Sequence, residues 1–160
     1  MCKERGFTAI ELMVVIAIIG MLGFAATPGL QKFYRIYKFN EHSFSIESIT
    51  KWARLKAMEN SINVGVCVSN NTVSIVNMGT SRSGVCNGTV LRTYSITDSF
   101  VSLAGAGAFG EQGVAFDPRG LAILGGYICV SDGEKFYKLC IQRNRGTIRV
   151  EKGAGGCGSC

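Results

Sequence analysis

The chain opens with a short charged segment and a long apolar run, and residues 3–26 read KERGFTAIELMVVIAIIGMLGFAA. The last twenty residues of this stretch carry one charge, that of Glu11. Twenty helical residues extend for about 30 Å, which is the thickness of the hydrocarbon core of a bilayer. Lys3 and Arg5 precede the run, and such a bias of positive charge keeps an N-terminus in the cytoplasm. The pattern predicts a helix that crosses a membrane once.

Glu11 lies about one helical turn inside the apolar run. An ionised carboxylate at full depth in a bilayer costs several kcal/mol, so such a residue is by default a functional candidate. Two interpretations follow: either the side chain reaches back to the lipid headgroups, or it pairs with a cation that another molecule supplies.

The small residue Gly6 stands before the apolar run. A secretory signal peptide is cut after its apolar region, and Gly23-Phe24-Ala25 could serve as such a site. Cleavage there would remove the helix from the mature protein, which leaves a second interpretation of this segment open.

Residues 3–20 resemble the N-terminal signature of type IV pilins and type II secretion pseudopilins. The resemblance implies that residues 1–6 are a leader peptide and that prepilin peptidase cuts between Gly6 and Phe7. It also implies that Phe7 is N-methylated to methylphenylalanine and that the helix is kept as the core of a filament. Glu11 would then pair with the Phe7 amine of a neighbouring subunit, which sets the subunit register.

The composition narrows the class of protein further. The 160 residues are 47% hydrophobic and 18% charged, with 21 glycines and a formal net charge of +6. A charge-driven disordered chain, a collagen and a coiled-coil rod are all excluded by this mixture. With one histidine and no catalytic constellation, we expect a protein that is not an enzyme and that needs no cofactor or metal.

Pro28, followed by Gly29, falls at the end of the apolar run and predicts a kink in the helix. Beyond it, large apolar residues recur at spacings of three, four and their sums, which predicts an amphipathic helix over 29–61 after a membrane segment over 7–28. This predicted apolar stripe consists of Leu30, Phe33, Tyr37, Phe44, Trp52 and Leu55. His42 lies in the same helix, and nothing in the sequence pairs with it.

The residues from 62 to 160 change to an alternating pattern, which predicts strands joined by tight turns at Asn70-Asn71 and Asp132-Gly133. The glycine-rich segment 104–110 has no such period and predicts a loop. We therefore expect an α+β fold, in which a long helix packs on an antiparallel sheet in a periplasmic head. The predicted strands are 64–68, 73–76, 89–96, 113–116, 127–130, 136–141 and 147–150.

A narrower resemblance joins three parts of the chain. Residues 53–60 leading into Val66-Cys67, residues 114–120, and residues 146–149 are similar to segments of the FimT/GspH minor pilins. This implies a minor pilin of a type IV pilus, with a GspH-like pseudopilin of type II secretion as the alternative. The implied partners are prepilin peptidase, the major pilin, other minor pilins and the inner membrane, in which the helix would be held with its N-terminus in the cytoplasm.

Some members of that family resemble DNA-uptake proteins, which carry a Gly-Arg-x-Arg arrangement in the last loop. Here Thr147 stands at the first arginine position, and only Arg149 matches. Residues 135–152 nevertheless hold six basic residues against one acid. Arg143, Arg145 and Arg149 are therefore candidates for weak contacts with the phosphates of DNA. The favoured interpretation is a solvated rim that keeps the tip soluble or contacts another pilin.

Six cysteines follow the apolar run, and an even number on the oxidising side of a membrane predicts disulfides. Sequence leaves fifteen connectivities open among six cysteines, of which Cys67–Cys86 is favoured because a hairpin and a short loop separate the two. With a turn at Asp132-Gly133, Cys129 would lie opposite Phe136, and a direct Cys129–Cys140 bridge would exceed the usual span. Cys157 and Cys160 form a C-x-x-C pair without the helix of a thioredoxin-like site, and we expect structural disulfides from them.

Overall fold

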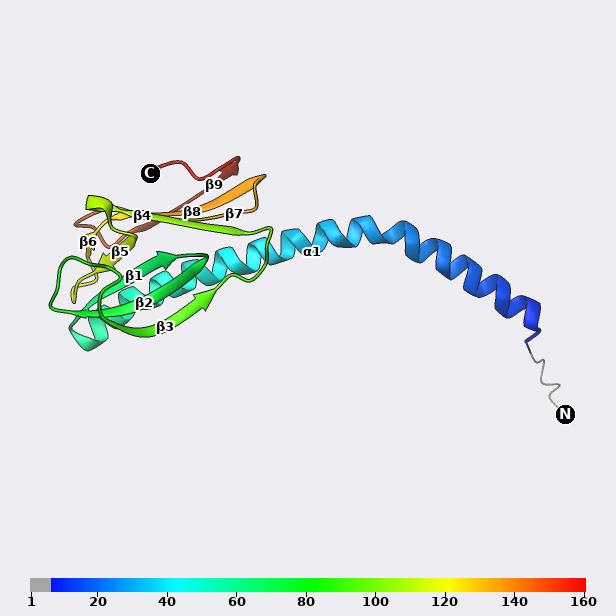
Figure 1. Cartoon of the computed structure of the whole chain (residues 1–160), viewed down its shortest axis with the longest axis horizontal. Helices are drawn as coiled ribbons and strands as arrows, with labels where there is room; N and C mark the ends of the chain where they lie inside the picture. The colour runs from blue at the N-terminus through cyan, green and yellow to red at the C-terminus, as the bar shows by residue number, and fades with distance from the viewer. Residues whose placement is uncertain (1–6) are drawn as a thin grey trace. The chain divides into compact units, whose positions relative to one another are not determined.

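The computed structural model describes residues 7–160, so the predicted leader and Gly6 lie outside the described residues. The predicted α+β class is confirmed: a long helix, α1 (Ala9–Asn60), is followed by antiparallel strands (Figure 1). The chain divides into two compact units at Tyr37 and Lys38, and each unit is described by itself below.

Helix α1 begins at an N-cap formed by Thr8. The Thr8 hydroxyl accepts a hydrogen bond from the Glu11 backbone N–H at 3.3 Å, as a threonine just before the first helical residue commonly does. Glu11 therefore lies in the first turn of the helix, where the helix dipole favours a negative charge.

The helix bends just before Pro28. Its two pieces, Ala9–Phe24 and Thr27–Asn60, meet at 43°. Proline has no N–H for the carbonyl four residues earlier, and the Thr27 hydroxyl donates to the Gly23 carbonyl oxygen at 3.1 Å, a bond that bends helices. Among the described helices, neither piece alone is long and apolar enough to cross a membrane, whereas the two together have the necessary length and composition.

The unit from residue 38 onward holds two sheets where the sequence suggested one. Their strand orders are β3-β2-β1-β5-β6 and β4-β7-β8-β9, and every pairing among the described strands is antiparallel (Figure 1). The strands are β1 (Asn63–Ser69), β2 (Thr72–Gly79), β3 (Thr89–Ser95), β4 (Ser102–Gly107), β5 (Gly113–Phe116), β6 (Ala122–Leu124), β7 (Gly126–Ser131), β8 (Lys135–Ile141) and β9 (Ile148–Ala154).

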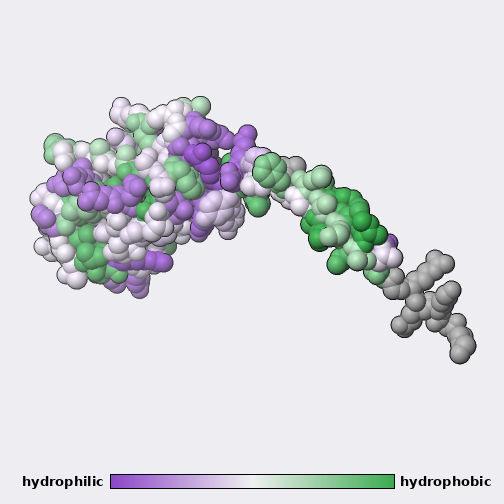
Figure 2. All heavy atoms as spheres, turned by 45° about the vertical axis from the view of Figure 1, so that its right-hand side comes forward, coloured by the Kyte–Doolittle hydropathy of each residue, from purple (hydrophilic) through white to green (hydrophobic). Residues whose placement is uncertain are grey.

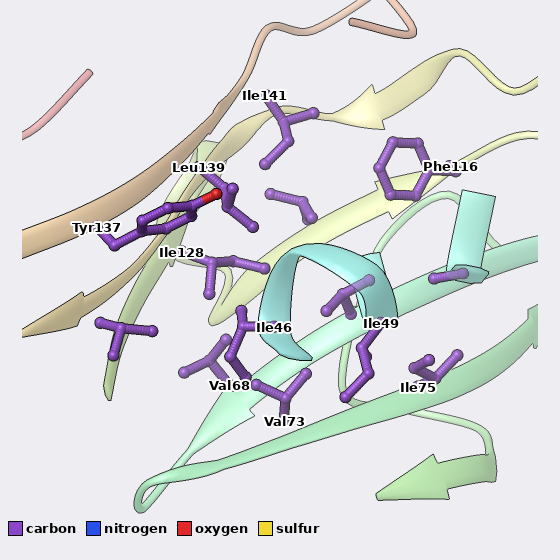
Figure 3. Close-up of a cluster of buried hydrophobic side chains, with 14 of the residues drawn as sticks. Ile46, Ile49, Val68, Val73, Ile75, Phe116, Ile128, Tyr137, Leu139 and Ile141 are labelled. Carbon is purple, nitrogen blue, oxygen red and sulfur yellow. The ribbon is translucent and has the colours of Figure 1, made fainter. Parts of the chain in front are cut away.

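The core of this unit lies between the two sheets and the second half of α1. Ile46 and Ile49 of the helix point among side chains from both sheets, including Val73 of β2 and Leu139 of β8 (Figure 3). The buried face of the helix consists of Phe39, His42, Ser43, Ile46, Ile49, Thr50, Ala53 and Ala57.

This buried face corrects the predicted apolar stripe. Phe44 and Leu55, which the sequence placed on the sheet, are more than half exposed, and Trp52 is only partly buried. Ala53 and Ala57 are fully buried in their place. The large side chains dominated the sequence pattern, whereas close packing of a helix on two sheets favours small and β-branched residues that fill the space without strain.

Strand β4 was predicted as a loop because alanine and glycine have little preference for strands. It pairs with β7 along its whole length, from Ser102 opposite Ser131 to Gly107 opposite Gly126. A Cβ atom on Gly105 would lie 2.7 Å from a methyl carbon of Val68 in β1. The small residues therefore let β4 approach the other sheet closely. Strand β6 was not predicted either.

The two predicted turns have different outcomes. Asn70 and Asn71 both have positive φ, as the tight turn between β1 and β2 requires. The turn between β7 and β8 includes Glu134 as well as Asp132-Gly133, so Cys129 lies opposite Lys138 and not opposite Phe136. The predicted register was therefore wrong by two residues.

Candidate functional site

Most of the large apolar side chains among the first 29 helical residues, Ala9 to Tyr37, are exposed. Ile10 is 67% exposed, Phe24 85% and Leu30 69%. Figure 2 shows strongly hydrophobic side chains gathered on the part of this segment toward the N-terminus. A contiguous apolar surface of this size marks a membrane or protein contact. The exposed large apolar residues between positions 7 and 37 are Phe7, Ile10, Leu12, Met13, Val14, Val15, Ile16, Ile18, Ile19, Met21, Leu22, Phe24, Leu30, Phe33, Tyr34, Ile36 and Tyr37.

Phe7 and Glu11 lie at the start of this segment. The Phe7 side chain is 80% exposed. Among residues 7–160 the Glu11 side chain has no ion-pair or hydrogen-bond partner, although its backbone N–H is held by Thr8. The carboxylate is thus available to a cation from outside the chain.

Three contacts hold the second half of α1 on the sheets, and the first corrects the prediction for His42. This side chain is 5% exposed. Its Nδ1 lies 2.8 Å from the Tyr94 hydroxyl and its Nε2 lies 2.7 Å from Asp98 Oδ2. Both partners are more than 50 residues away in sequence, and for this reason the histidine seemed unpaired before the fold was known.

The second contact joins Glu47 to the other sheet, where the Tyr137 hydroxyl of β8 donates to its carboxylate. The hydrogen bond from Lys51, at 2.6 Å, and the bond from Tyr137 hold the pKa of Glu47 below its ordinary value. Burial and the neighbouring carboxylate raise the pKa of Tyr137. The Lys152 Nζ atom of β9 lies 4.9 Å from the centroid of the Tyr137 ring, so the ammonium group lies over one face of the tyrosine that donates to Glu47.

The third contact explains two of the segments that carry the family resemblance. The Arg54 side chain donates from Nε to the Gly120 carbonyl oxygen at 2.9 Å. A Cβ atom on Gly146 would lie 2.7 Å from Arg54 Nη2 and 2.6 Å from the Gly120 carbonyl oxygen. Segments 114–120 and 146–149 therefore meet at the guanidinium of the helix, and their glycines leave room for it.

Asp117 organises the turn that presents Gly120. Its side chain is 3% exposed, and Oδ1 accepts hydrogen bonds from the backbone N–H groups of Arg119 and Leu121, both at 2.9 Å. The Arg119 guanidinium donates to Oδ2 at 3.0 Å. Burial raises the pKa of this carboxyl group, but the bonds from Leu121 and Arg119 outweigh burial and leave the pKa below its ordinary value. The segment is a rigid structural turn.

The six cysteines of the head form three disulfides: Cys67–Cys86, Cys129–Cys157 and Cys140–Cys160. The first is the pairing that the sequence favoured, and Cys129 and Cys140 are not joined to each other. The C-x-x-C pair is thus divided between two bridges, and these cysteines offer no thiolate to a metal. Among residues 7–160 no group of three or more metal-ligating side chains is found.

The two C-terminal disulfides hold the tail over the outer face of the β7–β8 hairpin. Lys138 lies beneath the tail, and the sequence indicated it only as one of six basic residues in the segment 135–152. Lys138 is 4% exposed. Its Nζ pairs with Glu151 Oε2 at 2.9 Å and donates to the Ser159 carbonyl oxygen at 3.1 Å. Lys138 is therefore fully engaged inside the head and is not part of a basic surface.

The three candidate arginines come together. Arg143, Arg145 and Arg149 line one open groove of about 600 Å³, which the Cys140–Cys160 disulfide and Glu151 also border. Arg149 is 76% exposed and has Glu151 Oε1 at 3.6 Å from its Nε. Lys135, Lys138 and Lys152 do not line this groove. The structure thus reduces the six basic residues of the segment to three that converge.

Comparison with known families gives two matches. Residues 1–27 match the family described as the prokaryotic N-terminal methylation motif. Residues 45–147, most of the head, match the family described as type II transport protein GspH. Comparison with curated proteins and with solved structures gives no match. The second matched region includes Arg54, the turn at Asp117 and Gly146, which are the residues that meet in the third helix contact.

Proposed function

The chain belongs to the GspH family of type IV pilin-like minor subunits, and from this premise we propose that it is a minor pilin of a type IV pilus. The family is one of structural subunits and not of enzymes. In this function prepilin peptidase removes residues 1–6, and the subunit waits in the inner membrane with its head in the periplasm. It then enters the pilus or the complex that primes it, together with the major pilin and other minor pilins.

The exposed apolar surface between positions 7 and 37 is the observation that carries this function. Seventeen large apolar side chains there are exposed in the isolated chain, and a water-exposed surface of that kind is unfavourable by about 25 cal/mol per Å² of apolar area. A membrane covers it before assembly, and the helices of neighbouring subunits cover it afterwards. The same apolar surface therefore holds the subunit in the membrane before assembly and packs against other subunits in the filament.

Phe7 and Glu11 give the assembled state its register. After cleavage the Phe7 nitrogen becomes a terminal amine, and the Glu11 carboxylate has no partner among the described residues. An ion pair between the two on neighbouring subunits satisfies a carboxylate that would otherwise be costly in an apolar surrounding. Methylation of the amine retains its positive charge.

We assign the chain to a pilus and not to a secretion pseudopilus on the resemblance of Val66-Cys67 and residues 114–120 to the pilus branch. A strain that lacks the gene tests this assignment. We expect it to lose surface pili or pilus-dependent movement, to secrete exoproteins normally, and to recover with the wild-type chain. A secretion defect with normal pili would instead assign the chain to type II secretion.

A second function, capture of DNA, is favoured by the groove that Arg143, Arg145 and Arg149 share. Arginines that converge on one groove bind phosphates by charge and by paired hydrogen bonds. Thr147 lines the same groove at the position where the DNA-uptake relatives carry an arginine, so the site has one charge fewer.

The test for DNA capture uses the full chain in an uncharged detergent. We expect it to retard duplex DNA at low salt and to lose this ability when all three arginines are replaced by alanine, because phosphate contacts dominate such binding. Retardation that persists in the triple variant, or its absence in the wild type even at low salt, would end this second function without affecting the first.

A further inference from the structure

An aromatic side chain occupies an unusual position beside the arginine groove. Phe109 is 79% exposed, and its backbone has φ 62° and ψ 27°, in the left-handed region. Bulky residues rarely adopt this conformation, because it is strained for a residue that has a Cβ atom. An exposed phenylalanine gains nothing from burial that would offset this strain, so the conformation points to a contact with another molecule.

The turn that carries Phe109, Ala108–Gly110, is fixed on both sides. The Ala108 N–H donates to the Gly125 carbonyl oxygen at 2.8 Å. After the turn, the Glu111 carboxylate accepts the backbone N–H groups of Gly84 at 2.7 Å and Val85 at 2.9 Å. The aromatic ring is therefore presented from a held backbone.

Arg143 connects this ring to two hollows in the surface. Its guanidinium carbon lies 5.0 Å from the Phe109 ring centroid, within the range of a cation–π contact. Arg143 lines the arginine groove, and it also lines a second hollow of about 290 Å³, together with Phe109, Arg82 and Arg119. The two hollows thus meet at Arg143 and form one path, the arginine track, which consists of Arg82, Arg119, Arg143, Arg145 and Arg149.

The carboxylates along the arginine track are engaged. Asp117 is bonded to Arg119, Glu111 accepts two backbone N–H groups, and Glu151 pairs with Lys138. Within the described residues, Arg82, Arg143 and Arg145 form no ion pair. These three charges are free to bind an anion.

We propose that the arginine track and Phe109 form a binding site for single-stranded nucleic acid. One base stacks on Phe109, and the phosphates on either side of it lie along the two hollows. Exposed aromatic rings beside a basic groove are the usual means of binding single strands, because every unpaired base offers a flat face. A duplex keeps its bases stacked on one another and gives the ring no such partner. This inference rests on the second function proposed above and narrows its ligand.

The experiment measures the affinity of the full, oxidised chain in uncharged detergent for a labelled single strand and for a duplex of the same length at low salt. We expect Phe109→Ala to weaken single-strand binding about tenfold, the effect of losing one base–aromatic stack, and to leave duplex binding unchanged. Lys135→Ala is the matched control for charge, because Lys135 lines neither hollow, and we expect little effect from it.

The outcomes separate this inference from the function on which it rests. Unchanged single-strand binding by Phe109→Ala, or an equal loss for both ligands, overturns the role of the ring. Binding of the duplex alone overturns the inference and leaves DNA capture standing. Binding of neither form at low salt ends both, and incorporation of the subunit into pili would still be judged by its own experiment.

Discussion

Arg54 of the helix and Gly120 of the β5–β6 turn are joined by a hydrogen bond of 2.9 Å from the guanidinium Nε to the carbonyl oxygen. The residues are 66 positions apart, and Gly146 packs against both of them. Three segments that resemble those of other family members thus meet at one point, and their shared role is to seat the helix on the sheets.

Replacement of Gly146 by alanine tests this contact. The added Cβ would lie 2.6 Å from the Gly120 carbonyl oxygen, and backbone cannot move away as a flexible side chain can. We expect the free energy of unfolding to fall by about 1–3 kcal/mol, the usual cost of overpacking. Thermal unfolding of the full chain in detergent measures this. Gly156→Ala, where nothing lies within 4 Å of the new atom, is the control and should unfold as the wild type does.

The bond between Tyr137 and Glu47 leads to a second prediction. Tyr137→Phe removes the hydroxyl and leaves Glu47 with Lys51 alone, so we expect a loss of about 1–3 kcal/mol, as for hydrogen bonds to charged groups. Tyr127→Phe serves as the matched control, because the Tyr127 hydroxyl makes no hydrogen bond among residues 7–160. A double-mutant cycle with Glu47→Gln isolates the pair, and a coupling energy near zero would contradict a direct role for the bond.

Asp117 predicts how stability depends on pH. Its pKa in the folded chain lies below the ordinary value of 3.8, so the unfolded chain takes up a proton first as the pH falls. The stabilisation is therefore complete well above pH 3.8 and is lost as the pH falls through the folded pKa. We expect Asp117→Asn to lower the free energy of unfolding near neutral pH and to have a smaller effect below pH 3.8. Urea unfolding of both chains across this range measures the difference, and a constant difference would show that the charge has no part in it.

The sequence alone predicted local features well. The bend near Pro28 and the hairpin at Asn70-Asn71 depend on residues close in the chain, and the Cys67–Cys86 bridge closes a short loop. In each case the deciding preference is that of a few neighbouring residues.

Features that depend on residues distant in the chain could not be predicted in the same way. The partners of His42 come from β3 and the segment after it. The tail that covers Lys138 is held there by two disulfides, and the sequence could not choose their connectivity among the fifteen possible ones. Strand β4 has weak preferences of its own and forms because β7 pairs with it. The buried face of α1 was predicted wrongly because the spacing of the large apolar residues was used to find it, whereas Ala53 and Ala57 make the close contact with the sheets.

Glu11 gives the prediction that bears most directly on assembly. Glu11→Ala should leave cleavage after Gly6 intact and reduce incorporation into pili, because the amine of the neighbouring subunit then loses its carboxylate. Leader removal is followed by the mass of the mature chain, and incorporation by the amount of the subunit in sheared pili. Thr8→Ala is the informative control. Thr8 caps the same helical turn and accepts the Glu11 N–H, so its loss weakens the N-cap without removing the charge. If Glu11 serves only to start the helix, the two variants will have similar defects. If its carboxylate sets the register, Thr8→Ala will enter pili almost normally while Glu11→Ala will not.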